Sequence, residues 1–159
     1  MKTIQIVIAA MLLAASAAAS ADPFAGKWML DVQRSKYPAG ARPKSMVIEI
    51  ETAGQAIRYH SETTYANGRT TQANYSAEYN GQQAVVMGAR GMMLPVSLKK
   101  VDRRTVVASY TRLLQVVATS RRVVSSDGRS MTITTISKDP AGKRVTTIGV
   151  YEKQRKQQR

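Results

Sequence analysis

Apolar and polar residues alternate along most of the chain after residue 22. Met46, Ile48 and Ile50 share one face of an extended segment, and Ile57 and Tyr59 share one face of the next. A period of two is that of a β-strand with one buried face. Beyond the N-terminal segment, no stretch shows a convincing helical period. The pattern therefore predicts an all-β fold.

Turn signals divide the chain into short segments. Asn67-Gly68, Asn80-Gly81 and Asp127-Gly128 are typical of tight hairpins, because both residues of each pair can adopt a positive φ angle. The segments between the turns are rich in Val, Ile, Thr and Tyr, which favour strands. We predict strands at about residues 26–33, 44–52, 56–65, 70–79, 83–88, 93–101, 104–112, 115–125, 130–138 and 144–153. Many short strands at this spacing predict a sandwich or a single antiparallel up-and-down β-barrel of about ten strands.

The face predicted to point inward is not purely apolar. It combines Ile with Tyr, Thr, Ser and Ala, whereas a sandwich core usually consists of Leu, Ile, Val and Phe. A buried Tyr hydroxyl needs a hydrogen-bond partner, and a partly polar barrel interior can provide one through water, other side chains or a ligand. This composition favours a barrel that holds an amphipathic ligand. The alternative is a tightly filled barrel with no cavity.

Three short segments resemble the lipocalins and fatty-acid-binding proteins, which together form the calycin group of β-barrels. Asp22 to Trp28, which contains a Gly-x-Trp motif, is similar to the first-strand motif of lipocalins. Arg121 to Met131 resembles the late hairpin of the intracellular fatty-acid-binding proteins, and Gly149 to Lys153 resembles their last strand. The resemblance implies a lipocalin-like barrel that binds a small molecule.

The resemblance also implies roles for individual residues. Gly26 and Trp28 would close one end of the barrel, and Arg121 or Arg122 could lie over the Trp28 ring as a cation–π partner. Two features differ from the fatty-acid-binding proteins. Gly149 stands where they carry an inward Arg, and residues 34–43 leave no room for their helical lid.

Residues 1–21 have the pattern of a secretory signal peptide. Lys2 is followed by an apolar run from Ile4 to Leu13, and Ala19-Ser20-Ala21 forms a cleavage site. The run is short for a membrane span of roughly 20 residues, which favours cleavage over an uncleaved anchor. We therefore expect a signal peptide over residues 1–21, a lipocalin-like barrel domain over 22–153 and a basic tail over 154–159. The protein would be periplasmic or secreted.

The chain is strongly basic, with a net charge of +14, and it contains no Cys. The lack of Cys excludes a lipid-anchored lipoprotein and any disulfide. Excess positive charge attracts polyanions, and the envelope offers lipopolysaccharide and acidic glycans. We expect no nucleic-acid partner, because the Tyr residues fall on the inward face rather than among exposed basic residues. The alternative interpretation of the charge is a solvated surface that keeps the protein soluble.

Candidate catalytic chemistry is sparse. His60 is the sole His and shares the outward face of its strand, and no second ligand for a metal or haem is evident. Glu49 and Glu51 form an outward pair of carboxylates, which we expect to be ion-pair partners of nearby Lys and Arg. We therefore predict no enzymatic activity, no catalytic residues, no metal and no cofactor.

These observations predict a monomeric, exported protein that holds a small apolar or amphipathic molecule inside its barrel. The predicted ligand-binding residues are Tyr59, Tyr75, Tyr79, Arg122 and Tyr151. The predicted apolar wall consists of Ile48, Ile50, Ile57, Met131 and Ile133. The alternative is a barrel without a cavity, whose basic surface binds envelope polyanions or whose Met92-Met93-Leu94 loop inhibits a protease.

Overall fold

The structure, a computed structural model, describes residues 21–88 and 94–155 of the chain. Most of the predicted signal peptide, residues 89–93 with Met92 and Met93, and the end of the basic tail lie outside the described residues. The strands are β1 (Gly26–Lys36), β2 (Pro43–Ala53), β3 (Ala56–Tyr65), β4 (Thr70–Glu78), β5 (Asn80–Ala84), β6 (Val96–Asp102), β7 (Thr105–Arg112), β8 (Gln115–Val124), β9 (Ser130–Lys138) and β10 (Arg144–Lys153). The described ranges contain no helix long and apolar enough to span a membrane.

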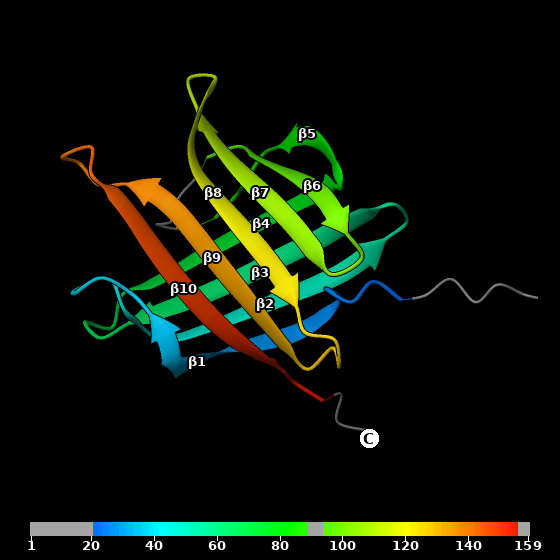
Figure 1. Ribbon diagram of the computed structural model, residues 1–159, viewed down its shortest axis with the longest axis horizontal. Helices are drawn as coiled ribbons and strands as arrows, with labels where there is room; N and C mark the ends of the chain where they lie inside the picture. Colours follow the sequence, from blue (N-terminus) through cyan, green and yellow to red (C-terminus); the bar gives the residue numbers. More distant parts are fainter. Residues whose placement is uncertain (1–20, 89–93, 156–159) are drawn as a thin grey trace, which may run out of the picture.

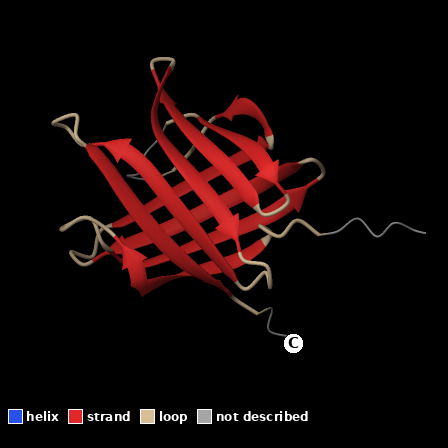
Figure 2. Cartoon of the chain, in the orientation of Figure 1, coloured by secondary structure: helices blue, strands red, loops and turns tan. Residues whose placement is uncertain are grey.

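All ten strands belong to one antiparallel sheet that curls into a barrel (Figures 1 and 2). Strands that are consecutive in the sequence pair with each other, except β4 and β5, which form the two edges of the sheet. The first strand, β1, also pairs with the last, β10. One bridge links β4 to the segment that follows β5, where Asn74 and Met87 exchange two backbone hydrogen bonds of 2.6 and 2.8 Å. The result is a nearly closed up-and-down barrel. This confirms the predicted architecture.

The fifth strand is the main difference from the prediction. It spans Asn80–Ala84 rather than residues 83–88, and Asn80-Gly81 does not form the two-residue hairpin turn predicted for it. Asn80 already pairs with Lys99 of β6, and Gly81, whose φ angle is 82°, lies inside β5 rather than in a turn between β4 and β5. The break between β4 and β5 therefore depends on a distant partner strand.

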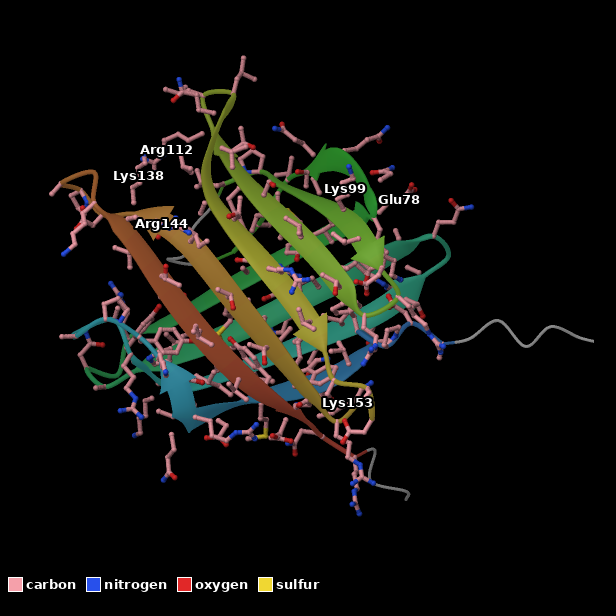
Figure 3. The ribbon with its side chains drawn as sticks, viewed as in Figure 1. Glu78, Lys99, Arg112, Lys138, Arg144 and Lys153 are labelled. Carbon is pink, nitrogen blue, oxygen red and sulfur yellow. The ribbon has the colours of Figure 1, made fainter. Side chains whose placement is uncertain are left out.

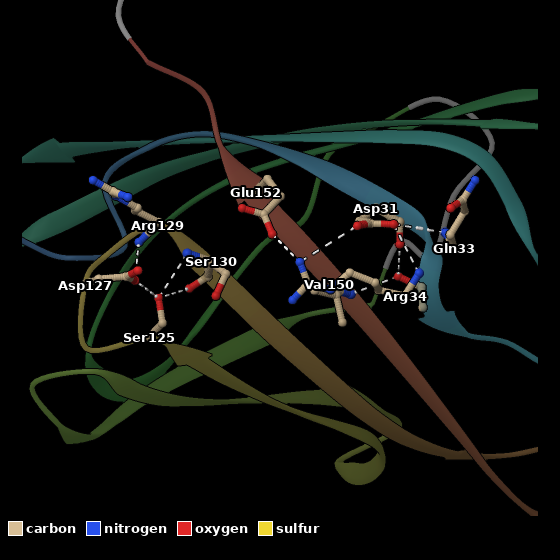
Figure 4. A network of polar contacts seen from close by, with 10 residues as sticks. Asp31, Gln33, Arg34, Ser125, Asp127, Arg129, Ser130, Val150 and Glu152 are labelled. Atoms are coloured by element: carbon tan, nitrogen blue, oxygen red, sulfur yellow. Dashed lines mark hydrogen bonds and ion pairs between the residues drawn. The ribbon is translucent and has the colours of Figure 1, made fainter.

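β1 is longer than predicted because it contains a wide bulge. Five steps along β1, from Asp31 to Lys36, correspond to two steps along β10, from Val150 to Ile148. The Ser35 hydroxyl donates a 2.6 Å hydrogen bond to the carbonyl of Asp31 and accepts a 2.9 Å bond from the Val150 amide. Figure 4 shows Asp31 and Val150, the two residues that this hydroxyl links. A side chain thus replaces the missing backbone partner of Val150.

The two ends of the barrel differ. One end, where β1 begins and β10 ends, is filled by fully buried side chains, and we call it the closed end. The largest of these are Trp28, Phe24, Ile48, Ile57, Leu98, Met131, Val106 and Val124. The other end carries the connections at residues 37–42, 66–69, 113–114 and 139–143, and we call it the open end. The interior beneath the open end is the polar part of the barrel.

Candidate ligand-binding site

Two adjoining hollows occupy the barrel interior. One, of about 310 Å³, extends to the β1–β2 connection, where Ala41 is exposed. The other, of about 230 Å³, reaches Val86 beside the gap between β4 and β5. Their shared wall consists of Met46, Tyr59, Thr63, Tyr110, Ser120 and Thr135. The interior is therefore hollow and mixed in polarity in its open half.

Arg122 is the charged group of this interior. It is 3% exposed, whereas the adjacent Arg121 faces solvent. Its Nη2 donates a hydrogen bond to the Tyr110 hydroxyl at 3.3 Å, and its Cζ lies 5.0 Å from the centroid of the Tyr59 ring. Its Nε has no hydrogen-bond partner. No carboxylate is among the described residues that line either hollow, so this buried cation has no counter-charge there.

Tyrosines surround Arg122. Tyr59 and Tyr75 lie directly opposite each other on β3 and β4, and their rings stack with centroids 4.5 Å apart. Burial raises the pKa of Tyr59, Tyr75 and Tyr151, so all three are neutral hydroxyls near neutral pH. The Tyr75 hydroxyl is buried without a hydrogen-bond partner. These groups cannot neutralise the guanidinium, but they can donate hydrogen bonds to an anion placed beside it.

Gly149 makes room for two further hydroxyls. A Cβ atom at this position would lie 2.9 Å from the Tyr37 hydroxyl and 3.0 Å from the Tyr151 hydroxyl. The Tyr151 hydroxyl also lies 3.2 Å from the Met46 sulfur, to which it donates a hydrogen bond. The position at which the fatty-acid-binding proteins carry an Arg is therefore occupied here by neutral donors. Arg122 is the only cation on the described walls of the two hollows.

Four of the five predicted ligand-binding residues line the hollows, namely Tyr59, Tyr75, Arg122 and Tyr151. Tyr79 lies apart from them. Its hydroxyl donates a 2.7 Å hydrogen bond to Asp22, and the Lys100 ammonium lies 4.5 Å from its ring centroid at the closed end. Tyr79 therefore anchors the segment that precedes β1 and is not part of the candidate site.

Two further tyrosines that line the hollows, Tyr37 and Tyr110, were not among the predicted site residues. Tyr37 lies in the β1–β2 connection, which carries no periodic signal, so no sequence pattern pointed to it. Tyr110 follows the buried Val106 and Ala108 at intervals of two on β7, and that alternation was a usable signal. Of the predicted apolar wall, only Ile133 lines a hollow, whereas Ile48, Ile50, Ile57 and Met131 belong to the core of the closed end.

Trp28 is completely buried, and its indole nitrogen donates a 2.9 Å hydrogen bond to the Phe24 carbonyl. The predicted cap from Arg121 or Arg122 is wrong. The Lys153 ammonium lies 4.9 Å from the Trp28 ring centroid, while Arg122 lies over Tyr59 instead. Lys153 is the direct cross-strand partner of Trp28 in the β1–β10 ladder, so both side chains point to the same face.

The polar residues of the outer face form surface contacts. Glu49 pairs with Lys27 at 2.8 Å and Glu51 with Arg58 at 3.9 Å, as expected. His60 is half-buried rather than fully exposed, and its Nδ1 lies 2.6 Å from the Asn74 side-chain oxygen. No group of three or more His, Asp or Glu side chains that could hold a metal is present in the described part of the chain.

The geometry of the strands defines a calycin-like β-barrel. The barrel is similar to zebrafish ileal bile acid-binding protein complexed with cholic acid, with a TM-score of 0.53 and 12% identity over 83% of this chain and 99% of that chain. A likeness to apocrustacyanin C1 has a TM-score of 0.41 and 12% identity over 84% of this chain and 62% of that chain. No family model and no curated protein matches the sequence. The likeness to the bile acid-binding protein confirms, for the fold alone, the resemblance inferred from the two ends of the sequence.

Proposed function

We propose that this protein is an exported carrier that binds an acidic amphipathic small molecule non-covalently inside its barrel. The acidic group would lie beside Arg122, and the apolar part would lie along Met46, Ile133 and the ring faces of Tyr59 and Tyr75. The export signal over residues 1–21 supports a periplasmic or secreted location.

The observation that carries this proposal is the unbalanced charge of Arg122. Removing a guanidinium from water is costly unless an anion and hydrogen bonds compensate for it. The surrounding groups supply one weak hydrogen bond and one ring face, and Nε has no partner. A carboxylate or sulfonate in the hollow would bond Nε and could also accept from the unpartnered Tyr75 hydroxyl.

The dimensions and composition of the interior support a ligand with both apolar and polar faces. The walls of the hollows combine the ring faces of the tyrosines and the thioether of Met46 with the hydroxyl groups of Thr63, Ser120 and Thr135. Cholic acid, bound by the zebrafish protein of similar fold, is an amphipathic carboxylic acid. This class of ligand has the chemistry that the hollow would accept.

The test is a binding titration with cholate and oleate, each compared with its uncharged methyl ester, by displacement of the fluorescent probe anilinonaphthalene sulfonate. The wild-type protein should bind the acids more tightly than the esters. Arg122→Met removes the cation and keeps an apolar side chain of similar length. It should weaken acid binding by about tenfold or more, since charged hydrogen bonds contribute roughly 1.5–3 kcal/mol each.

Arg121→Met is the matched control, because it removes the same charge from the outward side of the same strand. It should leave acid binding unchanged. Equal losses in both variants, or equal affinity for acid and ester in the wild type, would contradict the proposal. Native mass spectrometry of the protein from its own source would then identify any other ligand that co-purifies.

A further inference from the structure

The tip of the β7–β8 hairpin consists of two leucines that contact almost nothing. Leu113 is 91% exposed and Leu114 is 93% exposed, and the nearby Val116 is 59% exposed. Figure 1 shows this hairpin standing out from the open end of the barrel. Single exposed apolar residues are common, but two adjacent leucines at the tip of a protruding hairpin form an apolar tip that water solvates poorly.

The backbone at this tip is unfavourable for leucine. Arg112 pairs with Gln115, so Leu113 and Leu114 form a two-residue loop, and their φ angles are 46° and 66°. Loops of this kind favour Asn and Gly, because a Cβ atom is disfavoured at positive φ. No contact of the leucines in the described structure compensates for this strain. Strained positions that fold stability does not require are typical of functional sites.

Eight exposed cations lie at the same end of the barrel as the apolar tip. They are Lys36, Arg42, Lys44, Arg69, Arg112, Lys138, Lys143 and Arg144. Figure 3 shows Arg112, Lys138 and Arg144 close to the hairpin tips, with Lys153 at the far end of the barrel. None of the eight forms an ion pair with a described carboxylate.

The acidic residues lie elsewhere. In the described connections of the open end, Asp139 is the one carboxylate, and it accepts a hydrogen bond from the Lys143 amide in its own turn. The strand ends and connections of the closed end instead carry Asp22, Glu51, Glu78, Asp102, Asp127 and Glu152. The closed end also carries cations, among them Lys27, Arg58, Lys100, Arg104, Arg129 and Lys153, but these acidic residues offset most of their charge. The uncompensated positive charge is therefore greater at the open end, which carries the apolar tip.

We infer that the open end docks on an anionic phospholipid membrane, with Leu113 and Leu114 inserted among the acyl chains and the surrounding cations at the phosphate groups. A single weak signal gives only marginal membrane binding, whereas apolar insertion and charge attraction together make binding stable. The long Lys and Arg side chains can reach headgroups while the leucines lie deeper. This docking does not depend on whether the barrel holds a ligand, although the opening at Ala41 lies at the same end.

The experiment measures partition of the purified protein onto phosphatidylcholine vesicles with and without phosphatidylglycerol, by co-sedimentation. The wild type should bind the vesicles that contain phosphatidylglycerol. Leu113→Asn/Leu114→Gly should lower the partition coefficient at least about tenfold, because it removes the inserted apolar area. The same variant gives the loop its favoured sequence, so its melting temperature should not fall. Weaker binding by a protein of equal or higher stability separates docking from folding.

A second pair of variants tests the position of the charge. Arg112→Gln/Arg144→Gln at the open end should weaken binding by roughly tenfold. Arg104→Gln/Arg129→Gln changes the net charge equally in turns of the closed end and should have little effect. Equal losses in the two pairs would overturn the inference in favour of diffuse attraction.

Other outcomes would also overturn it. These are no binding by the wild type, binding that the loop variant retains in full, and equally tight binding to a soluble polyanion such as heparin that displaces the protein from vesicles. Size-exclusion chromatography with multi-angle light scattering, run without lipid, tests whether a second copy of this chain covers the tip. A dimer that the loop variant abolishes would show that the leucines contact a second copy of this chain instead.

Discussion

The two ends of the barrel consist of the same antiparallel strands but differ in the side chains that fill them. At the closed end, Trp28 and the apolar side chains around it exclude water, and Lys153 covers the indole ring. At the open end, the interior is lined by hydroxyls and one unbalanced guanidinium, and the hairpin tips carry exposed leucines and cations. The difference indicates that stability is concentrated at one end and recognition at the other.

This division has a physical basis. A barrel filled along its whole length would be more stable but would have no interior surface for a ligand. Buried polar groups such as Arg122 and the Tyr75 hydroxyl reduce stability unless they are satisfied. The dense packing of Phe24, Trp28 and Met131 at the other end offsets that cost.

The largest effect is expected from Trp28→Ala. The change removes a completely buried indole and its hydrogen bond to Phe24. It should lower the free energy of unfolding by about 3–5 kcal/mol, measured by urea denaturation. Met29→Ala, at the next and outward-facing position, should cost far less because Met29 is 44% exposed. Loss of ligand binding with unchanged stability in Trp28→Ala would show that Trp28 belongs to the binding site rather than to a structural plug.

A smaller effect is expected at the open end from Ser35→Ala. The Ser35 hydroxyl bridges the Asp31 carbonyl and the Val150 amide within the β1 bulge. Its removal leaves the Val150 amide without an acceptor and should cost about 1–3 kcal/mol of unfolding free energy. Ser45→Ala, at an exposed position on β2 near the same end, is the control and should be nearly neutral. A neutral Ser35→Ala would mean that water takes the place of the hydroxyl.

The smallest effect near neutral pH is expected from Tyr75→Phe, because the hydroxyl that it removes has no partner. At high pH the variant should differ from the wild type. The folded-state pKa of Tyr75 is raised by burial, so its contribution to stability is complete below the ordinary pKa of 10.0 and is lost as the pH rises above it. Tyr75→Phe should therefore move the pH of alkaline unfolding upward, monitored by circular dichroism and tyrosinate absorbance. A clear loss of stability at neutral pH would show that the hydroxyl has a partner.

The alternation in the sequence was sufficient to predict most of the barrel. Strands such as β3 and β9 begin and end where predicted, since their boundaries depend on local turn signals. The inward orientation of Tyr59, Tyr75 and Met131 also followed from the period of two. The predictions failed where the pattern was broken, at Asn80-Gly81 and in the connection that contains Tyr37.

The candidate site could be predicted only in part. The sequence showed that Arg122 or Arg121 would face inward but not which, because the segment around them has apolar residues in both phases. The β7–β8 ladder shifts register between Tyr110 and Thr111, and only the pairing of Arg122 with Val106 and Ile133 determines which arginine is inside. The register in which a strand pairs with its neighbours depends on those neighbours as well as on its own residues, so one segment of sequence does not determine it.

The sequence by itself determined the class of fold, the number of strands and the mixed polarity of the interior, because these depend on residue type and on a period of two. The tertiary structure decided that Lys153 rather than an arginine covers Trp28, because it pairs the first strand with the last. It also decided that the exposed leucines and eight exposed cations lie at the same end as the opening of the barrel. Contacts between residues far apart in the sequence leave no local pattern, so they became visible only when the sheet closed.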